Sequence, residues 1–128
     1  MTTWTSEELN KIGTTDELLI APLRRDGTLR NAVTIWAVRL GDDIYVRSVN
    51  GRTSAWFRSA QVRNEGHIRA GTVDKDVTFV EESAPEINEQ IDNAYRSKYR
   101  RYPSSVDHIV SSDARAATIK LLPRSTSS

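Results

Sequence analysis

Alternating apolar and polar residues fill much of the first 81 positions and predict β-strands. The longest such run covers residues 29–40, in which Val33 and Ile35 alternate with Thr34 and Trp36. Both faces of this run are mostly apolar, so we expect a single long strand that is central in its sheet.

Turn residues divide the other apolar runs into hairpins. The six expected strands span residues 17–24, 29–40, 44–49, 67–70, 73–81 and 118–122. Gly41-Asp42-Asp43 and Gly71-Thr72 are the turns of two antiparallel hairpins. Pro22 makes the first strand an edge strand or one that is broken near its end. Six antiparallel strands are best closed into a small barrel, because closure removes exposed sheet edges.

The N-terminal segment carries a helix-start signal. Thr5 and Glu8 have the spacing of a capping box, in which Thr5 is the N-cap and Glu8 the third helical residue. A short helix is expected to continue through Ile12 and to stop at Gly13.

Three further helical segments are expected later in the chain. Thr53-Ser54 offers N-cap side chains to a short helix over residues 55–62. Pro85 suits the first turn of the longest helix, which should end before Pro103. Residues 113–117 add a helical turn. We therefore predict one mainly β domain with flanking helices over residues 1–124 and a disordered tail over 125–128.

Composition and charge exclude several kinds of site. The 128 residues include 18 Lys and Arg against 17 Asp and Glu, so a general nucleic-acid binder is not expected. There is no cysteine, and His67 and His108 have no neighbouring ligand motif, so we expect no metal site. No GxSxG turn supports a hydrolase, and no catalytic side chain is assigned.

The N-terminus has no features of a targeting segment. The stretch MTTWTSEELNKIG is polar and acidic, unlike the basic start and apolar run of a signal peptide. No segment approaches the roughly 18 consecutive apolar residues that a membrane-spanning helix needs. A cytoplasmic protein without a membrane partner is the expectation.

The stretch IYVRSVNGRTSAWFR, residues 44–58, is the best candidate for an anion site. Arg47 and Arg52 flank the Asn50-Gly51 turn, and Thr53-Ser54 stands at the start of an expected helix, where free N–H groups favour phosphate. The alternative is purely structural, since Asn-Gly is a common hairpin turn and Ser and Thr are common helix caps.

Four pieces of the chain resemble the flavin-binding split-barrel superfamily, especially a subgroup of small proteins of unknown function. They are WTSEEL, VTIWAVRLGDDIYVRS, DNAYRSKYRRYPS and ARAATIKLLPR. The superfamily includes proteins similar to pyridoxamine 5′-phosphate oxidase and to deazaflavin-dependent nitroreductases. The resemblance implies a six-stranded antiparallel split β-barrel, a homodimer, and a small-molecule cofactor, FMN or a deazaflavin.

The resemblance also implies roles for individual residues. Arg47-Ser48 and Arg52-Thr53-Ser54 match the segments that hold the flavin phosphate, and Thr34 and Trp36 match the strand that runs along the ring. Trp56 is a further candidate for stacking on the ring, with an ordinary core position as the alternative.

Two hypotheses about function follow. The first is a flavin- or deazaflavin-binding oxidoreductase-like protein, in which the cofactor performs the chemistry. The second is a non-catalytic dimeric split barrel that binds a small ligand or a protein partner and has no flavin. The second is favoured by Arg52-Thr53, which stands where the oxidases commonly carry an Arg-Lys pair, so that one positive charge is missing.

Overall fold

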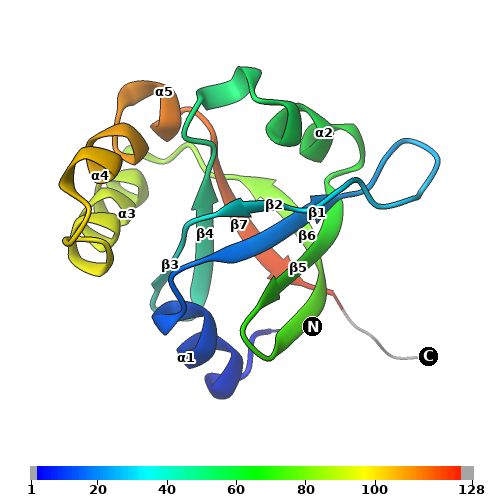
Figure 1. Cartoon of the computed structure of the whole chain (residues 1–128), viewed down its shortest axis with the longest axis horizontal. Helices are drawn as coiled ribbons and strands as arrows, with labels where there is room; N and C mark the ends of the chain where they lie inside the picture. Colours follow the sequence, from blue (N-terminus) through cyan, green and yellow to red (C-terminus); the bar gives the residue numbers. More distant parts are fainter. Residues whose placement is uncertain (1–2, 125–128) are drawn as a thin grey trace.

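A computed structural model describes residues 3–124 and contains a seven-stranded antiparallel sheet that curls into a nearly closed barrel (Figure 1). The strands are β1 (Leu18–Pro22), β2 (Val33–Ile35), β3 (Ala37–Leu40), β4 (Asp43–Arg47), β5 (Glu65–Ala70), β6 (Val73–Glu81) and β7 (Thr118–Pro123). Their order in the sheet is β2-β1-β5-β6-β7-β4-β3. The predicted fold class is confirmed, with seven strands rather than six. The tail predicted over 125–128 lies outside the described residues.

The seventh strand arises because the long run over residues 29–40 breaks at Trp36. On the N-terminal side of the break, β2 pairs with β1, with Thr34 opposite Leu19. On the C-terminal side, β3 pairs with β4, with Ala37 opposite Val46. The run was predicted to be one central strand, and that prediction is wrong: its two halves are the first and last strands of the sheet. The segment that bends at Trp36 therefore joins the two edges of the sheet and closes the barrel. Because β2 and β3 do not pair with each other, the barrel wall is split beside this bend.

Side chains of α3 (Pro85–Lys98) and the residue after it hold the backbone at this break. The Tyr95 hydroxyl donates to the Trp36 carbonyl at 2.9 Å. The Lys98 ammonium donates to the Ala37 carbonyl at 2.6 Å. The Tyr99 hydroxyl lies 3.3 Å from the same oxygen and donates its proton to the Asp16 carbonyl at 2.6 Å. Buried carbonyls need such partners, so the break is a supported feature of the fold.

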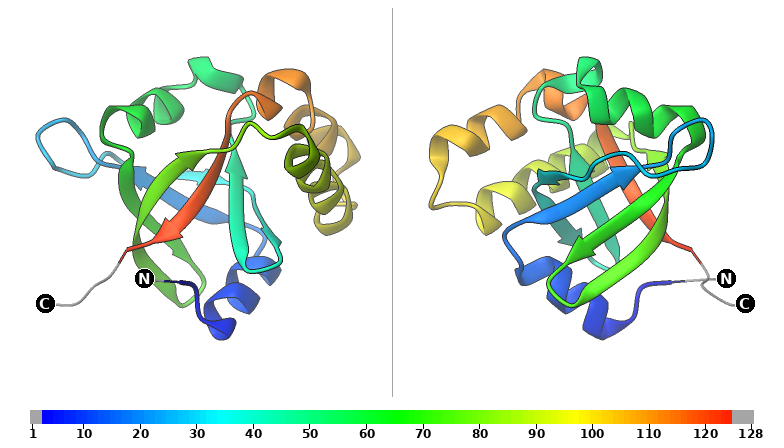
Figure 2. Two further views of the ribbon diagram at one scale, coloured as in Figure 1. Left: turned by 180° about the vertical axis from the view of Figure 1, so that it is seen from behind. Right: turned by 45° about the vertical axis from the view of Figure 1, so that its right-hand side comes forward.

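The helices are arranged around the barrel in three places (Figures 1 and 2). They are α1 (Ser6–Thr14), α2 (Ala55–Arg63), α3, α4 (Pro103–Ile109) and α5 (Ser112–Arg115). In all three views α1 and α2 lie at opposite ends of the barrel, and α3 and α4 lie against its side. None of the described helices has the length and apolar character needed to cross a bilayer.

Most of the predicted helices form as expected. The capping box of α1 is present, with Thr5 and Glu8 each bonded to the other's backbone N–H. This helix runs through Gly13 to Thr14. α4 was not predicted, because Pro103 had been interpreted only as the end of the preceding helix. Proline is equally suited to the first turn of a new helix, and here it begins one.

Two hydrophobic clusters hold the elements together. The larger fills the barrel and includes Phe57 of α2, Ile20 of β1 and Leu121 of β7. The smaller lies between β3, β4 and the helices α3 and α4, and includes Tyr45 and Tyr95. The split in the wall lies near the boundary between these clusters.

β1 pairs with a strand on each side although it ends in a proline, and its backbone packs closely against β5. β1 lies between β2 and β5, so it is broken at its end by Pro22 rather than an edge strand. Pro22 stands opposite Gly66 of β5. A Cβ atom on Gly66 would lie 2.6 Å from the Ala21 carbonyl oxygen and 2.7 Å from the Phe79 ring. Only glycine fits this crossing.

We expect Gly66→Ala to destabilise the protein by about 1–3 kcal/mol, because the added methyl group overpacks a buried crossing. Gly13→Ala is the matched control: its new Cβ would lie at an ordinary 3.4 Å from Arg39, and alanine favours the helix. Urea unfolding measures both. Equal stability of the two variants would contradict the account of the crossing.

The buried Lys98 ammonium should make stability depend on pH. Burial lowers the pKa of Lys98 to about 8. The unfolded chain, with a lysine pKa near 10.4, then holds more protons than the folded chain above pH 8. Stability should therefore gain an upward contribution between pH 8 and about 9.5. Lys98→Met should remove this contribution, which urea unfolding at pH 8 and at about pH 9.5 measures. The prediction would be contradicted if the free energies of unfolding of variant and parent differed by the same amount at both pH values.

Candidate functional site

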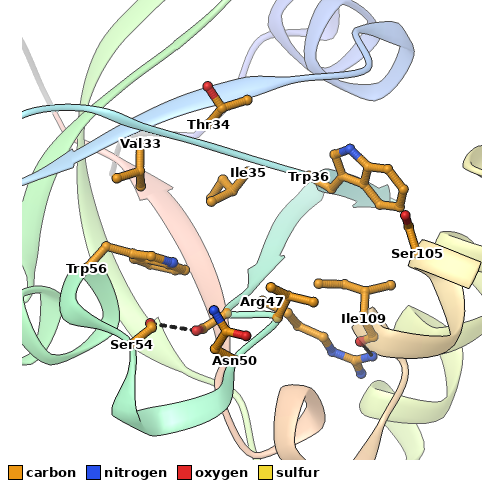
Figure 3. A pocket seen from close by; sticks show the side chains of 12 residues that line it. Val33, Thr34, Ile35, Trp36, Arg47, Asn50, Ser54, Trp56, Ser105 and Ile109 are labelled. Carbon is orange, nitrogen blue, oxygen red and sulfur yellow. Dashed lines mark hydrogen bonds between the residues drawn. The ribbon is translucent and has the colours of Figure 1, made fainter.

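A pocket of about 380 Å³ opens at the split in the barrel wall (Figure 3). It lies between β2, the segment that follows β4, the first turn of α2, and α4. Six of the eight residues predicted to bind a cofactor line it: Thr34, Trp36, Arg47, Ser48, Ser54 and Trp56. The break at Trp36 thus brings together residues from three separate segments.

The walls of the pocket are mainly apolar. Val33 and Ile35 point into it from β2, whereas the Thr34 side chain lies on the opposite face of the strand (Figure 3). Trp36 and Trp56 lie on opposite sides of the pocket. The Trp36 ring is fixed by stacking on Tyr99, with the centroids 3.9 Å apart and the planes 4° from parallel. The flat, rigid surfaces suit an aromatic ligand.

Two serine hydroxyls meet at the α2 end of the pocket. The Oγ atoms of Ser48 and Ser54 are 2.6 Å apart. Ser54 is the N-cap of α2 and accepts from the Phe57 N–H at 3.4 Å. Arg47, which precedes the Asn50-Gly51 turn, was predicted to join Ser54 in a phosphate site. Instead, Gly51–Thr53 forms a single turn of 3-10 helix that leads into α2, and Ser48 is the residue that reaches Ser54.

The Arg47 guanidinium turns away from the serines and is buried, with no exposed side-chain surface. It forms an ion pair with Asp92 and donates to the Ile109 carbonyl at 3.1 Å. It also donates to the backbone and side-chain oxygens of Asn88, both at 3.0 Å, and to the Thr118 hydroxyl at 2.9 Å. A guanidinium has five N–H donors, and these contacts use all five.

Arg52 and Thr53 are not among the residues that line the pocket. Arg52 donates to Glu81 at 2.6 Å and to the Ala116 carbonyl at 2.9 Å. The hydrogen bond from Arg52 lowers the pKa of Glu81, so this carboxylate is ionised at neutral pH. The structure therefore separates the two arginines of the predicted phosphate site and engages each with a carboxylate.

The pocket offers binding groups but no proton-transfer group. Among its lining residues only Arg47 is charged, and its charge is paired with Asp92. Within residues 3–124, no Asp, Glu, His, Lys, Cys or Tyr lines it. The lining therefore offers apolar surfaces and neutral hydrogen-bonding groups, which suit the binding of a small molecule.

Sequence reasoning missed several residues of this region. Asn50, Ser105 and Ile109 also line the pocket, and the last two belong to the unpredicted α4. Asn88 and Asp92 of α3 hold Arg47, and one signal for them was available. They are four positions apart and lie on the same face of the helix as Tyr95 and Tyr99. Polar residues on a face that packs against the core need a buried polar partner.

Comparison with known proteins gives one family match. The family described as "Uncharacterized protein conserved in bacteria (DUF2255)" matches residues 8–121, nearly the whole chain. A search among curated proteins gives no significant match.

Several solved structures share the fold at low sequence identity. HutZ, the haem storage protein from Vibrio cholerae, is 14% identical with a TM-score of 0.62, covering 97% of this chain and 92% of its own. The conserved hypothetical protein Rv2991 from Mycobacterium tuberculosis is 12% identical with a TM-score of 0.63, covering 98% and 83%. The FAD and haem binding protein from Mycobacterium smegmatis is 17% identical with a TM-score of 0.54, covering 94% and 65%. At these identities the likeness shows the split-barrel fold.

We expect Asp92→Ala to destabilise the protein by about 3–5 kcal/mol, because it leaves the Arg47 charge buried without its carboxylate. Glu89→Ala is the control, since Glu89 is exposed on the same helix and its loss should change stability by no more than about 0.5 kcal/mol. Thermal and urea unfolding measure both variants. An Asp92→Ala variant as stable as Glu89→Ala would show that the buried network contributes little.

Proposed function

This chain belongs to the DUF2255 family, and we propose that it binds a flavin-type cofactor, FMN or a deazaflavin, in the split of its barrel wall. The observation that carries the proposal is the pocket itself. It places the rigid Trp36 and Trp56 rings on either side of an apolar space beside β2.

The size and lining of the pocket support this proposal. Its volume of about 380 Å³ lies within the roughly 300–1,000 Å³ typical of small-molecule sites. Apolar walls with a few polar groups at one end are also typical of such sites. A flat ring would lie along Val33 and Ile35, and the polar part of the cofactor would reach Ser48 and Ser54.

Flavin is a better match than haem to the residues of this pocket. Two of the structures with the same fold are described as a haem storage protein and as an FAD and haem binding protein. Haem iron needs an axial ligand such as His, Cys, Met or Tyr, and none of these lines the pocket in the part of the chain that the structure describes. A flavin ring needs only flat apolar surfaces and hydrogen-bond partners.

In this proposal the cofactor supplies electron or hydride transfer, and the protein supplies binding and orientation. Trp36 and the β2 side chains set the plane of the ring. The buried network around Arg47 fixes the end of β4, and thereby Ser48, the next residue.

A second candidate is a non-catalytic module that binds a different small ligand in the same pocket. The absence of proton-transfer groups among the lining residues favours it as well. A titration with FMN and with a deazaflavin separates the two candidates, because only the first predicts saturable binding of a flavin. The homodimer stays a prediction in both.

We expect Val49→Trp to weaken flavin binding at least tenfold, because Val49 is exposed at the mouth of the pocket and an indole there would obstruct it. Val80→Trp is the matched control: Val80 is similarly exposed, on β6, and does not line the pocket. Titration of FMN and of a deazaflavin, followed by ligand fluorescence, measures binding to each variant.

The parent protein should bind one of these cofactors saturably at one site per chain, and Val80→Trp should bind it equally well. Failure of the parent to bind either cofactor would refute the flavin proposal and leave the non-catalytic module. Equal weakening by both substitutions would place the binding site elsewhere on the protein.

A further inference from the structure

We infer that this pocket recognises a flat ring with an uncharged polar end and does not select for a phosphate. The inference rests on the proposed function and specifies its ligand class: among flavins, the phosphorylated and unphosphorylated forms should bind alike. Three features of the pocket carry it, and each concerns the charges or hydrogen-bonding groups in or beside its lining.

The first feature is that Arg47 has no donor left for a ligand. Its five N–H groups bind Asp92, Ile109, Asn88 and Thr118, with Asn88 accepting twice. Asp92 also neutralises its charge, and the side chain has no exposed surface. To bind a phosphate, Arg47 would have to leave this buried network, and Asp92 would then keep only Arg115, at 3.7 Å.

The second feature is that the other nearby arginines lie outside the pocket lining. Arg52 is engaged with Glu81 and the Ala116 carbonyl. Arg30 donates to the Ala55 carbonyl and contacts Ser59, and together with Arg58 it lines a separate groove beside α2. No carboxylate lines the pocket either, so an anion would be tolerated but not attracted.

The third feature is a set of neutral polar groups at the same end. The Oγ atoms of Ser48 and Ser54 are 2.6 Å apart, so one hydroxyl proton lies between them. Ser48 has no exposed surface and Ser54 is half-buried, so Ser54 is the member of the pair that can reach a ligand. The Asn50 side chain also lines this end and has no hydrogen-bond partner among residues 3–124. These groups suit carbonyl oxygens or the hydroxyl groups of a sugar-like chain.

The experiment compares riboflavin with FMN, which differ only in the phosphate. We expect their Kd values to agree within fivefold, and their ratio to be unchanged between low and physiological salt, because no ionic contact is involved. Arg52→Ala should leave both Kd values unchanged. Ser48→Ala removes the partner that orients the Ser54 hydroxyl, so it should weaken riboflavin and FMN binding by the same factor, about fivefold for one hydrogen bond.

Ser111→Ala is the control for Ser48→Ala. Ser111 caps α5 and does not line the pocket, so its loss should leave both Kd values unchanged. FMN binding more than fivefold tighter than riboflavin would overturn the inference while supporting the proposed function, and loss of that preference in Arg52→Ala would identify the missed phosphate contact. Failure of riboflavin, FMN and the deazaflavin alike to bind would refute the proposed function and the inference with it.

Discussion

The break of one strand at Trp36 is the constraint on which the rest of this structure depends. Its two halves pair with β1 and with β4, at opposite ends of the strand order, so the same bend closes the barrel and splits its wall. The break leaves carbonyls that need partners, and Tyr95 and Lys98 provide them. The position of α3 is thereby tied to the place where the pocket opens.

The Arg47 network connects the same helix to the end of β4. Arg47 is the largest fully buried side chain, and it holds Asp92 and Asn88 of α3 against β4 and β7. A residue that the sequence presents as an anion ligand therefore serves the fold. Its neighbour Ser48 takes the place at the pocket, so the chemistry of the site is set by hydroxyl groups and aromatic surfaces rather than by charge.

Local signals in the sequence predicted much of the fold. The capping box of α1 and the turns at Gly41 and Gly71 depend on neighbouring residues alone, and the structure contains them as expected. The bend at Trp36 was not predicted, because both halves of the run have strand character and only distant partners decide where it breaks. The direction of the Arg47 side chain depends likewise on Asp92, 45 positions away. The alternation of residues along a strand predicts the face of the sheet on which a side chain lies, but not which residues pack against that face.

The most direct test of this account is a crystal structure of the protein saturated with riboflavin or FMN. We expect electron density for the ring in the split, beside Val33 and Ile35 and between Trp36 and Trp56, with the polar end at Ser48 and Ser54. We also expect Arg47 to keep its ion pair with Asp92 in the bound state. A flavin located elsewhere on the chain, or a phosphate bonded to Arg47 in place of Asp92, would contradict this account.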